Sequence, residues 1–139
     1  MLRDTAWAMS QENLEIVLAA LNRFEEGKPF RTRWAEDALV TSPEGWPEAG
    51  PFRGRKAILR QFERLRSDWA ENRITEIDVL AEEGEWVVIR ARWQTRGAGS
   101  GIENEVEVAM AFRVRDGHLV EGHARWDPAE ALEAAGLSE

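Results

Sequence analysis

Two arginines stand out in this chain because their spacing would bring two guanidinium groups to one place. Arg90 and Arg92 lie two residues apart in a stretch with the pattern of a strand, and alternate side chains of a strand point to the same face. If that face lines an apolar cavity, the two buried cations require an anionic partner, such as a ligand carboxylate or enolate. The alternative is a set of structural ion pairs with Glu103, Glu105 or Glu107 on the neighbouring strand.

His123 is the residue best suited to acid–base chemistry, because free imidazole titrates near neutral pH. It shares a predicted strand face with Glu121. The opposite face carries Gly122 and Ala124, two small residues that would leave room for a pocket beside Trp126. By this alternation His123 is expected on the outer face of the sheet or at a dimer interface, which favours a structural role over a catalytic one.

The sequence contains no pattern for a metal or a nucleotide cofactor. It has no cysteine. His118 and His123 are five residues apart and point to opposite faces of a regular strand, so they cannot chelate one ion together. The glycine-rich segment RGAGSG precedes a predicted strand and lacks the pattern of a phosphate-binding loop. We therefore expect neither a metal nor a cofactor.

Length and charge restrict the remaining classes of protein. With 139 residues, the chain is expected to form one domain over residues 10–139, preceded by a loose arm over residues 1–9. The net charge of −8 argues against nucleic acid and anionic membranes as partners, since both require a cationic surface. No apolar run approaches the roughly 20 residues of a membrane span. A cytoplasmic location is the expectation.

The first third of the chain has the pattern of helices. Ser10 is a good N-cap for a helix that ends at Gly27. Its apolar residues recur at the spacing of one helix face: Leu14, Val17, Leu18, Leu21 and Phe24. Pro29 can open a second, short helix with Phe30 and Trp34 on one side. A short strand over residues 39–41 and a proline-rich loop around Trp46 follow, then a helix over residues 54–66.

Strands dominate the second half of the chain. Residues 73–80 and 85–95 are predicted strands, and the latter is apolar on both faces, so it should be covered on both sides. Residues 102–126 form a long hairpin about the turn Asp116-Gly117. One face of its first strand is apolar, through Val106, Val108, Met110, Phe112 and Val114. Pro128 begins a closing helix. Helices first and an antiparallel meander afterwards indicate an α+β fold, with a strongly curved sheet folded against three helices.

Five segments of the chain, in this order, resemble one known family. They are SQENLEIVLAALNRFEEG, WAEDALVTSP, PFRGRKAI, RGAGSG and RVRDGHLVEGHARWDPAEALEAAGL. The pattern is similar to SnoaL-like proteins of the nuclear transport factor 2 superfamily, whose relatives include ketosteroid isomerases, polyketide cyclases and epoxide hydrolases. The resemblance implies a cone-shaped α+β barrel in which a curved antiparallel sheet wraps on three helices around an apolar pocket. It also implies a homodimer through the outer face of the sheet.

The catalytic residues of these relatives are largely missing here. Where a ketosteroid isomerase has its aspartate base, the matching position is Ser42, and a hydroxyl without an adjacent base cannot abstract a carbon-bound proton at neutral pH. The tyrosine and aspartic acid of its oxyanion hole match Val17 and Met110. The chain has no tyrosine at all. The resemblance therefore does not extend to ketosteroid isomerase chemistry.

Two further enzyme types match only weakly. The limonene-type epoxide hydrolases use an Asp-Arg-Asp arrangement, which here keeps Arg90 alone, with Arg92 and Ala124 in place of the carboxylates. The SnoaL-type cyclases use an aspartate in the pocket, for which Asp127 is the nearest candidate. Glu121 and Glu107 are the alternatives if the faces are reversed.

Two hypotheses of function follow. The first is a protein that binds a small apolar molecule, with Arg90 as its polar anchor. If Arg90, His123 or Asp127 is catalytic, such a protein would be a cofactor-free isomerase, cyclase or hydrolase that acts on a polycyclic or terpenoid-like substrate. The predicted pocket wall is Trp34, Trp46, Val88, Arg90, Met110, Phe112 and Trp126. The second is a non-catalytic dimeric carrier or association module whose pocket is filled by some of its seven tryptophans.

Overall fold

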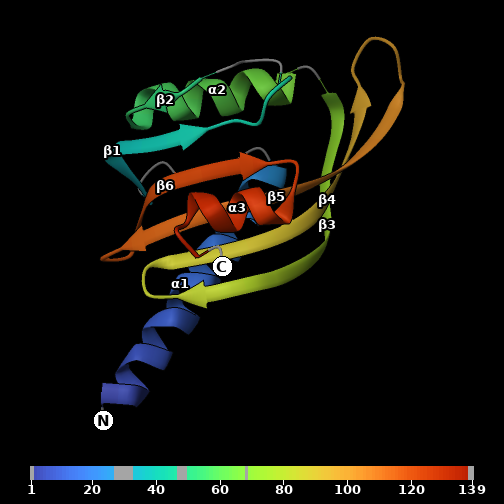
Figure 1. Ribbon diagram of the computed structural model, residues 1–139. Coiled ribbons are helices and arrows are strands. Elements are labelled where there is room, and N and C mark those ends of the chain that lie inside the picture. The colour runs from blue at the N-terminus through green and yellow to red at the C-terminus, as the bar shows by residue number, and fades with distance from the viewer. Residues whose placement is uncertain (1, 27–32, 47–49, 68, 138–139) are drawn as a thin grey trace.

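The computed structural model describes residues 2–26, 33–46, 50–67 and 69–137, which form three helices and a six-stranded sheet (Figure 1). In chain order the elements are α1 (Leu2–Glu26), β1 (Trp34–Thr41), β2 (Phe52–Arg53), α2 (Arg55–Ser67), β3 (Trp69–Glu83), β4 (Trp86–Gly97), β5 (Glu103–Arg115), β6 (His118–Arg125) and α3 (Pro128–Ala134). The predicted α+β class is confirmed.

Helix α1 is longer than the sequence analysis predicted. It begins at Leu2 and not after Ser10, so the segment predicted as a loose arm is helical. The segment before Ser10 contains neither glycine nor proline, and leucine, arginine, alanine and methionine all favour a helix. Nothing in this stretch stops the helix, and the N-cap predicted at Ser10 was wrong.

The sheet is mixed and open, in the order β2-β1-β6-β5-β4-β3. Strands β3 to β6 form the predicted antiparallel meander, but β1 pairs with β6 in parallel, from Trp34 opposite Leu119 to Thr41 opposite His123. Trp34 therefore starts a strand and does not lie on a short helix. The rest of that predicted helix falls in residues 27–32, outside the described part of the chain. Strand β2 lies in the proline-rich loop, where no strand was predicted.

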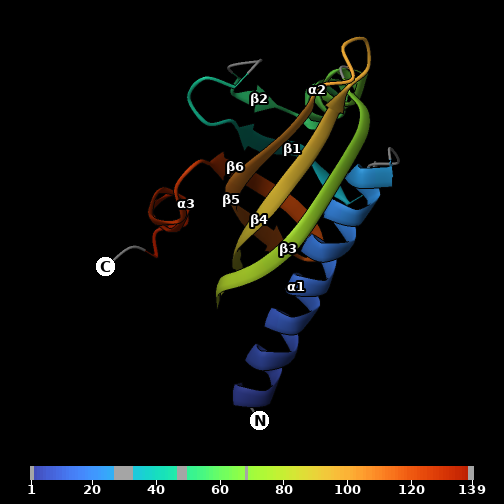
Figure 2. The same cartoon turned by 90° about the vertical axis from the view of Figure 1, so that its right-hand side faces the viewer.

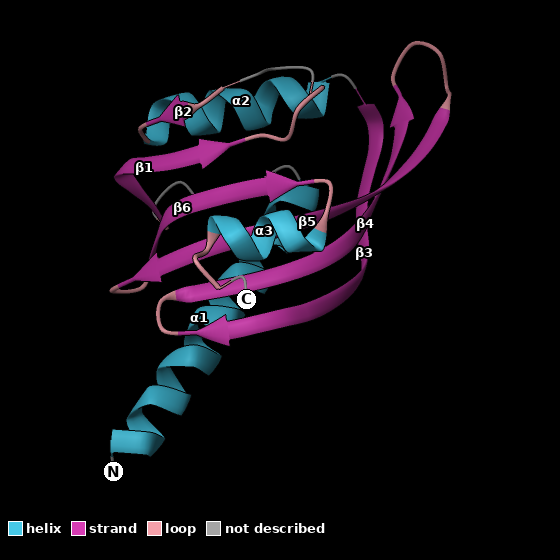
Figure 3. Cartoon of the chain, viewed as in Figure 1, coloured by secondary structure: helices cyan, strands magenta, loops and turns pink. Residues whose placement is uncertain are grey.

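The two faces of the curved sheet are covered by different helices. Figure 2 shows α1 and α3 on opposite sides of the sheet, and Figure 3 shows α2 lying across one end of it beside β1. We call the face toward α1 and α2 the concave face and the face toward α3 the convex face. The predicted curved sheet folded against three helices is confirmed, with α3 packed on the convex face.

The main core fills the concave face. Apolar residues of α1, α2 and the strands pack together there, and several are fully buried: Val17, Ile58, Val87, Ile89, Val114 and Leu119. Each such side chain stabilises the fold by about 1.5–3 kcal/mol relative to exposure. The Glu25 carboxylate also accepts a hydrogen bond of 2.6 Å from the backbone N–H of Ile74, which ties the end of α1 to β3.

A second, smaller core fixes α3 on the convex face. Ala131 of α3 and Ala135, the C-cap residue of this helix, pack against Val88, Ala109 and Ala111 of the sheet. Four of these five residues are alanines, so the helix backbone can approach the strands closely. Strand β4 is therefore buried on both faces, as its sequence predicted.

The long hairpin of β5 and β6 turns as predicted. Asp116 and Gly117 have φ angles of 51° and 77°, the left-handed conformations that a two-residue turn of this kind requires. Phe112 pairs with Gly122 and Met110 with Ala124, so the small residues of β6 lie beside the large residues of β5.

Gly122 gives a test of this packing. A Cβ atom there would lie 3.2 Å from the Trp34 ring and 3.5 Å from the Phe112 ring. We expect Gly122→Ala to lower the free energy of unfolding by about 1 kcal/mol, because an extra methyl group must displace a buried aromatic side chain. Urea denaturation measures this change. Gly99→Ala is the control, since nothing lies within 4 Å of its Cβ position, and an equal effect at both sites would contradict the packing argument.

Candidate ligand-binding cavity

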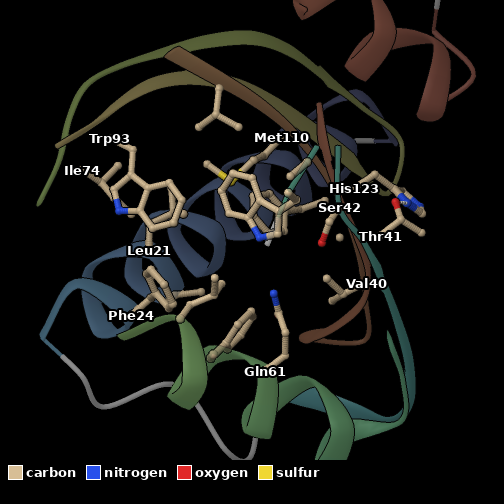
Figure 4. A pocket seen from close by; sticks show the side chains of 18 of the residues that line it. Leu21, Phe24, Val40, Thr41, Ser42, Gln61, Ile74, Trp93, Met110 and His123 are labelled. Carbon is tan, nitrogen blue, oxygen red and sulfur yellow. Dashed lines mark hydrogen bonds between the residues drawn. The ribbon is translucent and has the colours of Figure 1, made fainter. Parts of the chain in front are cut away.

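A cavity of about 120 Å³ lies between the concave face, α1 and α2 (Figure 4). Most of the residues around it are apolar. Its walls are formed by Ala20, Leu21 and Phe24 of α1, by Gln61, Phe62 and Leu65 of α2, by Trp34, Val40, Thr41, Ser42 and Trp46 of β1 and the loop after it, and by Ile74, Trp93, Val108, Met110, Phe112, Gly122, His123 and Ala124 of the other strands.

Aromatic rings in edge contact hold the wall together where the helices meet the sheet. The ring centroid of Phe62 lies 5.3 Å from that of Phe24 and 5.7 Å from that of Trp34. Phe24 in turn lies 6.2 Å from Trp93. Edge-to-face contacts at these separations are favourable beyond the area they bury. They fix the positions of α1 and α2 relative to the strands, and so the shape of the cavity.

One indole occupies part of the space inside this wall. The Trp46 ring stacks on Trp93 with a centroid distance of 5.0 Å and an interplanar angle of 23°. Trp126 lies outside, 5.4 Å from Trp46, and its indole N–H donates a hydrogen bond to the backbone carbonyl of Glu44. Trp46 is therefore held between a residue of the cavity wall and a residue at the protein surface.

Four polar residues contribute to the lining, and one of them has an unused polar atom. These residues are Thr41, Ser42, Gln61 and His123. Gln61 is 2% exposed, and within the described part of the chain its Oε1 atom has no hydrogen-bond partner. Gln61 was not predicted as a cavity residue, although it lies between Ile58 and Leu65 at the spacing of the apolar face of α2, a pattern that indicates burial.

Four of the seven residues of the predicted pocket wall line the cavity, namely Trp34, Trp46, Met110 and Phe112. The other three do not. Val88 points to the convex face and packs against α3. Arg90 lies on that same face, two residues further along β4. Trp126 follows the end of β6 and is 40% exposed. These three placements were wrong. Alternation along β4 puts Val87 and Ile89, and not Val88 and Arg90, on the concave face.

The two arginines expected on one face of a strand, Arg90 and Arg92, form ion pairs at the surface. Arg90 contacts Asp78 at 3.0 Å and Glu107 at 3.6 Å. Arg92 contacts Glu76 at 2.6 Å and Glu105 at 2.8 Å. This is the cross-strand alternative raised from the sequence. Half-exposed pairs of this kind contribute little to stability, and the hydrogen bond with Glu105 raises the pKa of Arg92.

His123 touches the cavity, but its ring belongs to the convex face. It pairs across the strands with Ala111, a residue of the α3 core, and its ring stacks on Trp86 with a centroid distance of 6.0 Å. Its Nδ1 lies 2.6 Å from the Thr41 hydroxyl and its Nε2 lies 2.9 Å from the Glu121 carboxylate. Figure 4 shows the imidazole beside Thr41, at the edge of the cavity.

This hydroxyl–imidazole–carboxylate chain is directed away from the cavity. Thr41 pairs with His123 across parallel strands, and its hydroxyl also accepts a hydrogen bond of 2.9 Å from Arg125. Arg113 donates to the other oxygen of Glu121 at 3.0 Å. Burial works to raise the pKa of Glu121, but the hydrogen bonds from His123 and Arg113 outweigh it and lower that pKa overall. The chain joins β1, β6 and β5 as a structural network.

The remaining acid–base candidate also has a structural position. The Asp127 side chain accepts a hydrogen bond of 2.8 Å from the backbone N–H of Ala129 and caps the N-terminus of α3.

In the described part of the chain, no group of three or more His, Cys, Asp or Glu residues could hold a metal ion. None of the described helices is both long and apolar enough to cross a membrane.

Comparison with known proteins places this fold in a class. The arrangement of helices and curved sheet is that of the nuclear transport factor 2-like α+β proteins. The chain belongs to the SnoaL-like domain family, whose model matches residues 17–122. No curated protein matches the chain.

Three solved structures illustrate the similarity of fold. A nuclear transport factor 2-like protein from Burkholderia xenovorans is 26% identical, with 90% of this chain and 95% of that chain covered and a TM-score of 0.71. A putative polyketide cyclase from Xanthomonas campestris is 21% identical, with coverages of 86% and 93% and a TM-score of 0.73. TerC, co-crystallised with polyporic acid, is 18% identical, with coverages of 88% and 98% and a TM-score of 0.72.

The network around Glu121 leads to a pH-dependent prediction. Because its pKa is lower in the folded protein than the usual value near 4.5, its contribution to stability is complete above that value and is lost as the pH falls through the folded-state pKa. We expect Glu121→Gln to lower the free energy of unfolding by roughly 1–2 kcal/mol at pH 7, since two hydrogen bonds to a charged group are weakened. The difference from the wild type should shrink toward pH 3.

Urea denaturation across this pH range measures the effect. Glu82→Gln is the matched control, because Glu82 is an exposed glutamate of β3. A Glu121→Gln protein whose deficit stays constant from pH 7 to pH 3 would contradict the role assigned to the carboxylate.

Proposed function

We propose that this protein binds a small, uncharged and largely apolar molecule in the cavity between the concave face and the helices α1 and α2. The observation that carries the proposal is the composition of the wall, which combines six aromatic side chains with a buried amide whose oxygen has no hydrogen-bond partner among the described residues. Ligand pockets typically have this character, with mostly apolar walls and a few placed polar groups. TerC, which shares the fold, was co-crystallised with polyporic acid.

Binding without acid–base catalysis fits the cavity better than an enzymatic function. Among the described lining residues, His123 is the only one with an imidazole or carboxylate side chain, and its ring stacks on Trp86 of the convex face. Ser42 occupies the position of the ketosteroid isomerase base, and a hydroxyl without a neighbouring base cannot take its place. The carrier or association module is therefore the hypothesis that we favour over a cofactor-free isomerase, cyclase or hydrolase.

The size of the cavity limits the ligand. An apolar protein cavity of about 150 Å³ can hold one benzene ring, whereas pockets for larger molecules usually measure about 300–1,000 Å³. At about 120 Å³ the cavity fits a single ring at most. A polycyclic or terpenoid-like ligand requires Trp46 to leave its stack on Trp93.

Trp46→Ala tests this limit. Removing the indole should enlarge the cavity, so we expect the variant to bind naphthalene at least tenfold more tightly than the wild type does, while toluene binds to both proteins. Isothermal titration calorimetry with the two hydrocarbons measures the dissociation constants. Trp86→Ala is the matched control, because Trp86 lies against His123 on the convex face. If neither hydrocarbon binds to the wild type or to Trp46→Ala, the binding function is wrong.

We also propose that residues 10–139 act as one domain. Two copies of this domain associate, in our proposal, through the part of the convex face that α3 leaves uncovered. That surface carries the paired charges of Arg90 and Arg92, which a second copy could contact without leaving an isolated buried charge. We expect a mass of about twice 15.8 kDa in size-exclusion chromatography with light scattering. Arg92→Glu should shift this mass toward the monomer by placing a third carboxylate beside Glu76 and Glu105. A wild-type mass near 15.8 kDa would refute the dimer.

A further inference from the structure

The side-chain amide of Gln61 lines the cavity and is not fully hydrogen-bonded within the described residues. The side chain is 2% exposed, and its Oε1 has no hydrogen-bond partner there. Buried amide oxygens are nearly always hydrogen-bonded, because an unpaired one loses its interaction with water without compensation. A leucine at this position would continue the apolar face of α2 without that loss.

The amide is directed at the space that a ligand would occupy. Gln61 projects from α2 toward the interior of the cavity, and the Ser42 hydroxyl points into the same space from the end of β1 (Figure 4). An amide offers an oxygen that accepts and an N–H that donates, and the two ends exchange when the group rotates by half a turn. A hydroxyl group is the simplest partner for both orientations, since it also donates and accepts.

The charge of the cavity restricts the ligand further. No described lining residue is an arginine, lysine, aspartate or glutamate. A ligand carboxylate would therefore enter an apolar site without a counter-ion, which is costly. This excludes the carboxylate that the sequence analysis considered for Arg90, because Arg90 lies on the convex face and pairs with Asp78 and Glu107.

The walls favour a flat ring as the body of the ligand. Trp93 presents its face to the interior, where Trp46 now stacks on it. An aromatic ring gains from stacking as well as from burial. From these observations we infer that the ligand is an uncharged hydroxylated aromatic ring, a phenol in its simplest form, whose hydroxyl group is held by the Gln61 amide with Ser42 as a second polar contact. This inference rests on the proposed binding function and names the chemical class of its ligand.

Three probes of matched shape test the inference. They are p-xylene, p-cresol and p-toluate, which carry on the same ring a methyl group, a hydroxyl group and a carboxylate. The indole N–H signals of the ¹⁵N-labelled protein report binding, with those of Trp46 and Trp93 assigned from Trp→Phe variants. We expect p-xylene and p-cresol to shift these two signals, and p-toluate to leave them unchanged up to concentrations that saturate p-cresol.

The decisive quantity is the preference for p-cresol over p-xylene. It is expressed as the dissociation constant of p-xylene divided by that of p-cresol. Gln61→Leu should reduce this ratio about tenfold, since it removes the hydrogen bond to the hydroxyl while the apolar probe keeps its contacts. If Gln61→Leu does not fold, Gln61→Met takes its place, because methionine keeps the unbranched shape of glutamine. It should reduce the ratio by a similar factor. Gln11→Leu, the same change at an exposed position of α1, should leave the ratio unaltered.

The outcomes separate this inference from the proposed function. If p-xylene binds but the ratio is the same in the wild type and both Gln61 variants, the inference is overturned and the binding function stands. Binding of p-toluate as tight as that of p-cresol also overturns it. If no probe shifts the Trp46 or Trp93 signals, the binding function fails and the inference fails with it.

Discussion

Side-chain alternation along the three central strands is the constraint on which the rest of the structure depends. Within β4, successive residues Val87 and Val88 serve two different cores, one beneath α1 and α2 and the other beneath α3. A shift of register by one residue would exchange these faces, placing Arg90 in the cavity and Ile89 in water. The cost of burying a guanidinium group without a partner excludes that register. The position of each cavity residue thus follows from the pairing of β4 with β5 and of β5 with β6.

Small residues determine how closely each layer approaches the sheet. On the convex face, Ala109 and Ala111 allow α3 to pack through its own alanines. On the concave face, Gly122 leaves the space that the Trp34 ring fills, with a hypothetical Cβ only 3.2 Å from that ring. Trp34 in turn contacts Phe62 of α2. The lack of a side chain at residue 122 therefore affects the position of a helix and, through it, the width of the cavity.

The sequence was sufficient for the features that depend on local pattern. The alternation from Val106 to Val114, the Asp116-Gly117 turn and the start of the closing helix at Pro128 all agree with the structure. It was not sufficient for features that depend on distant partners. Trp34 has the spacing of a helix, but pairing with Leu119 makes it the start of β1. Arg90 could have belonged to either face, because β4 is apolar on both and only the position of α3 distinguishes them. Gln61 was not predicted because the polar residues of α2 were all expected to face solvent. Its position on the same helix face as Ile58 and Leu65 indicates instead that it is buried.

The distribution of charge supports the proposed binding function over proton transfer in the cavity. The chain has 26 acidic and 18 basic residues, yet no described residue of either kind lines the cavity. Those on the convex face satisfy one another, as in the network that joins Arg113, Glu121 and His123. Moving any one of them to the concave face would leave its partner unpaired and place a charge in an apolar wall, so the network and the neutral cavity are two results of the same alternation. What remains available to a ligand is a neutral amide and a hydroxyl. These groups orient a bound molecule by hydrogen bonds, but neither accepts a proton from carbon near neutral pH.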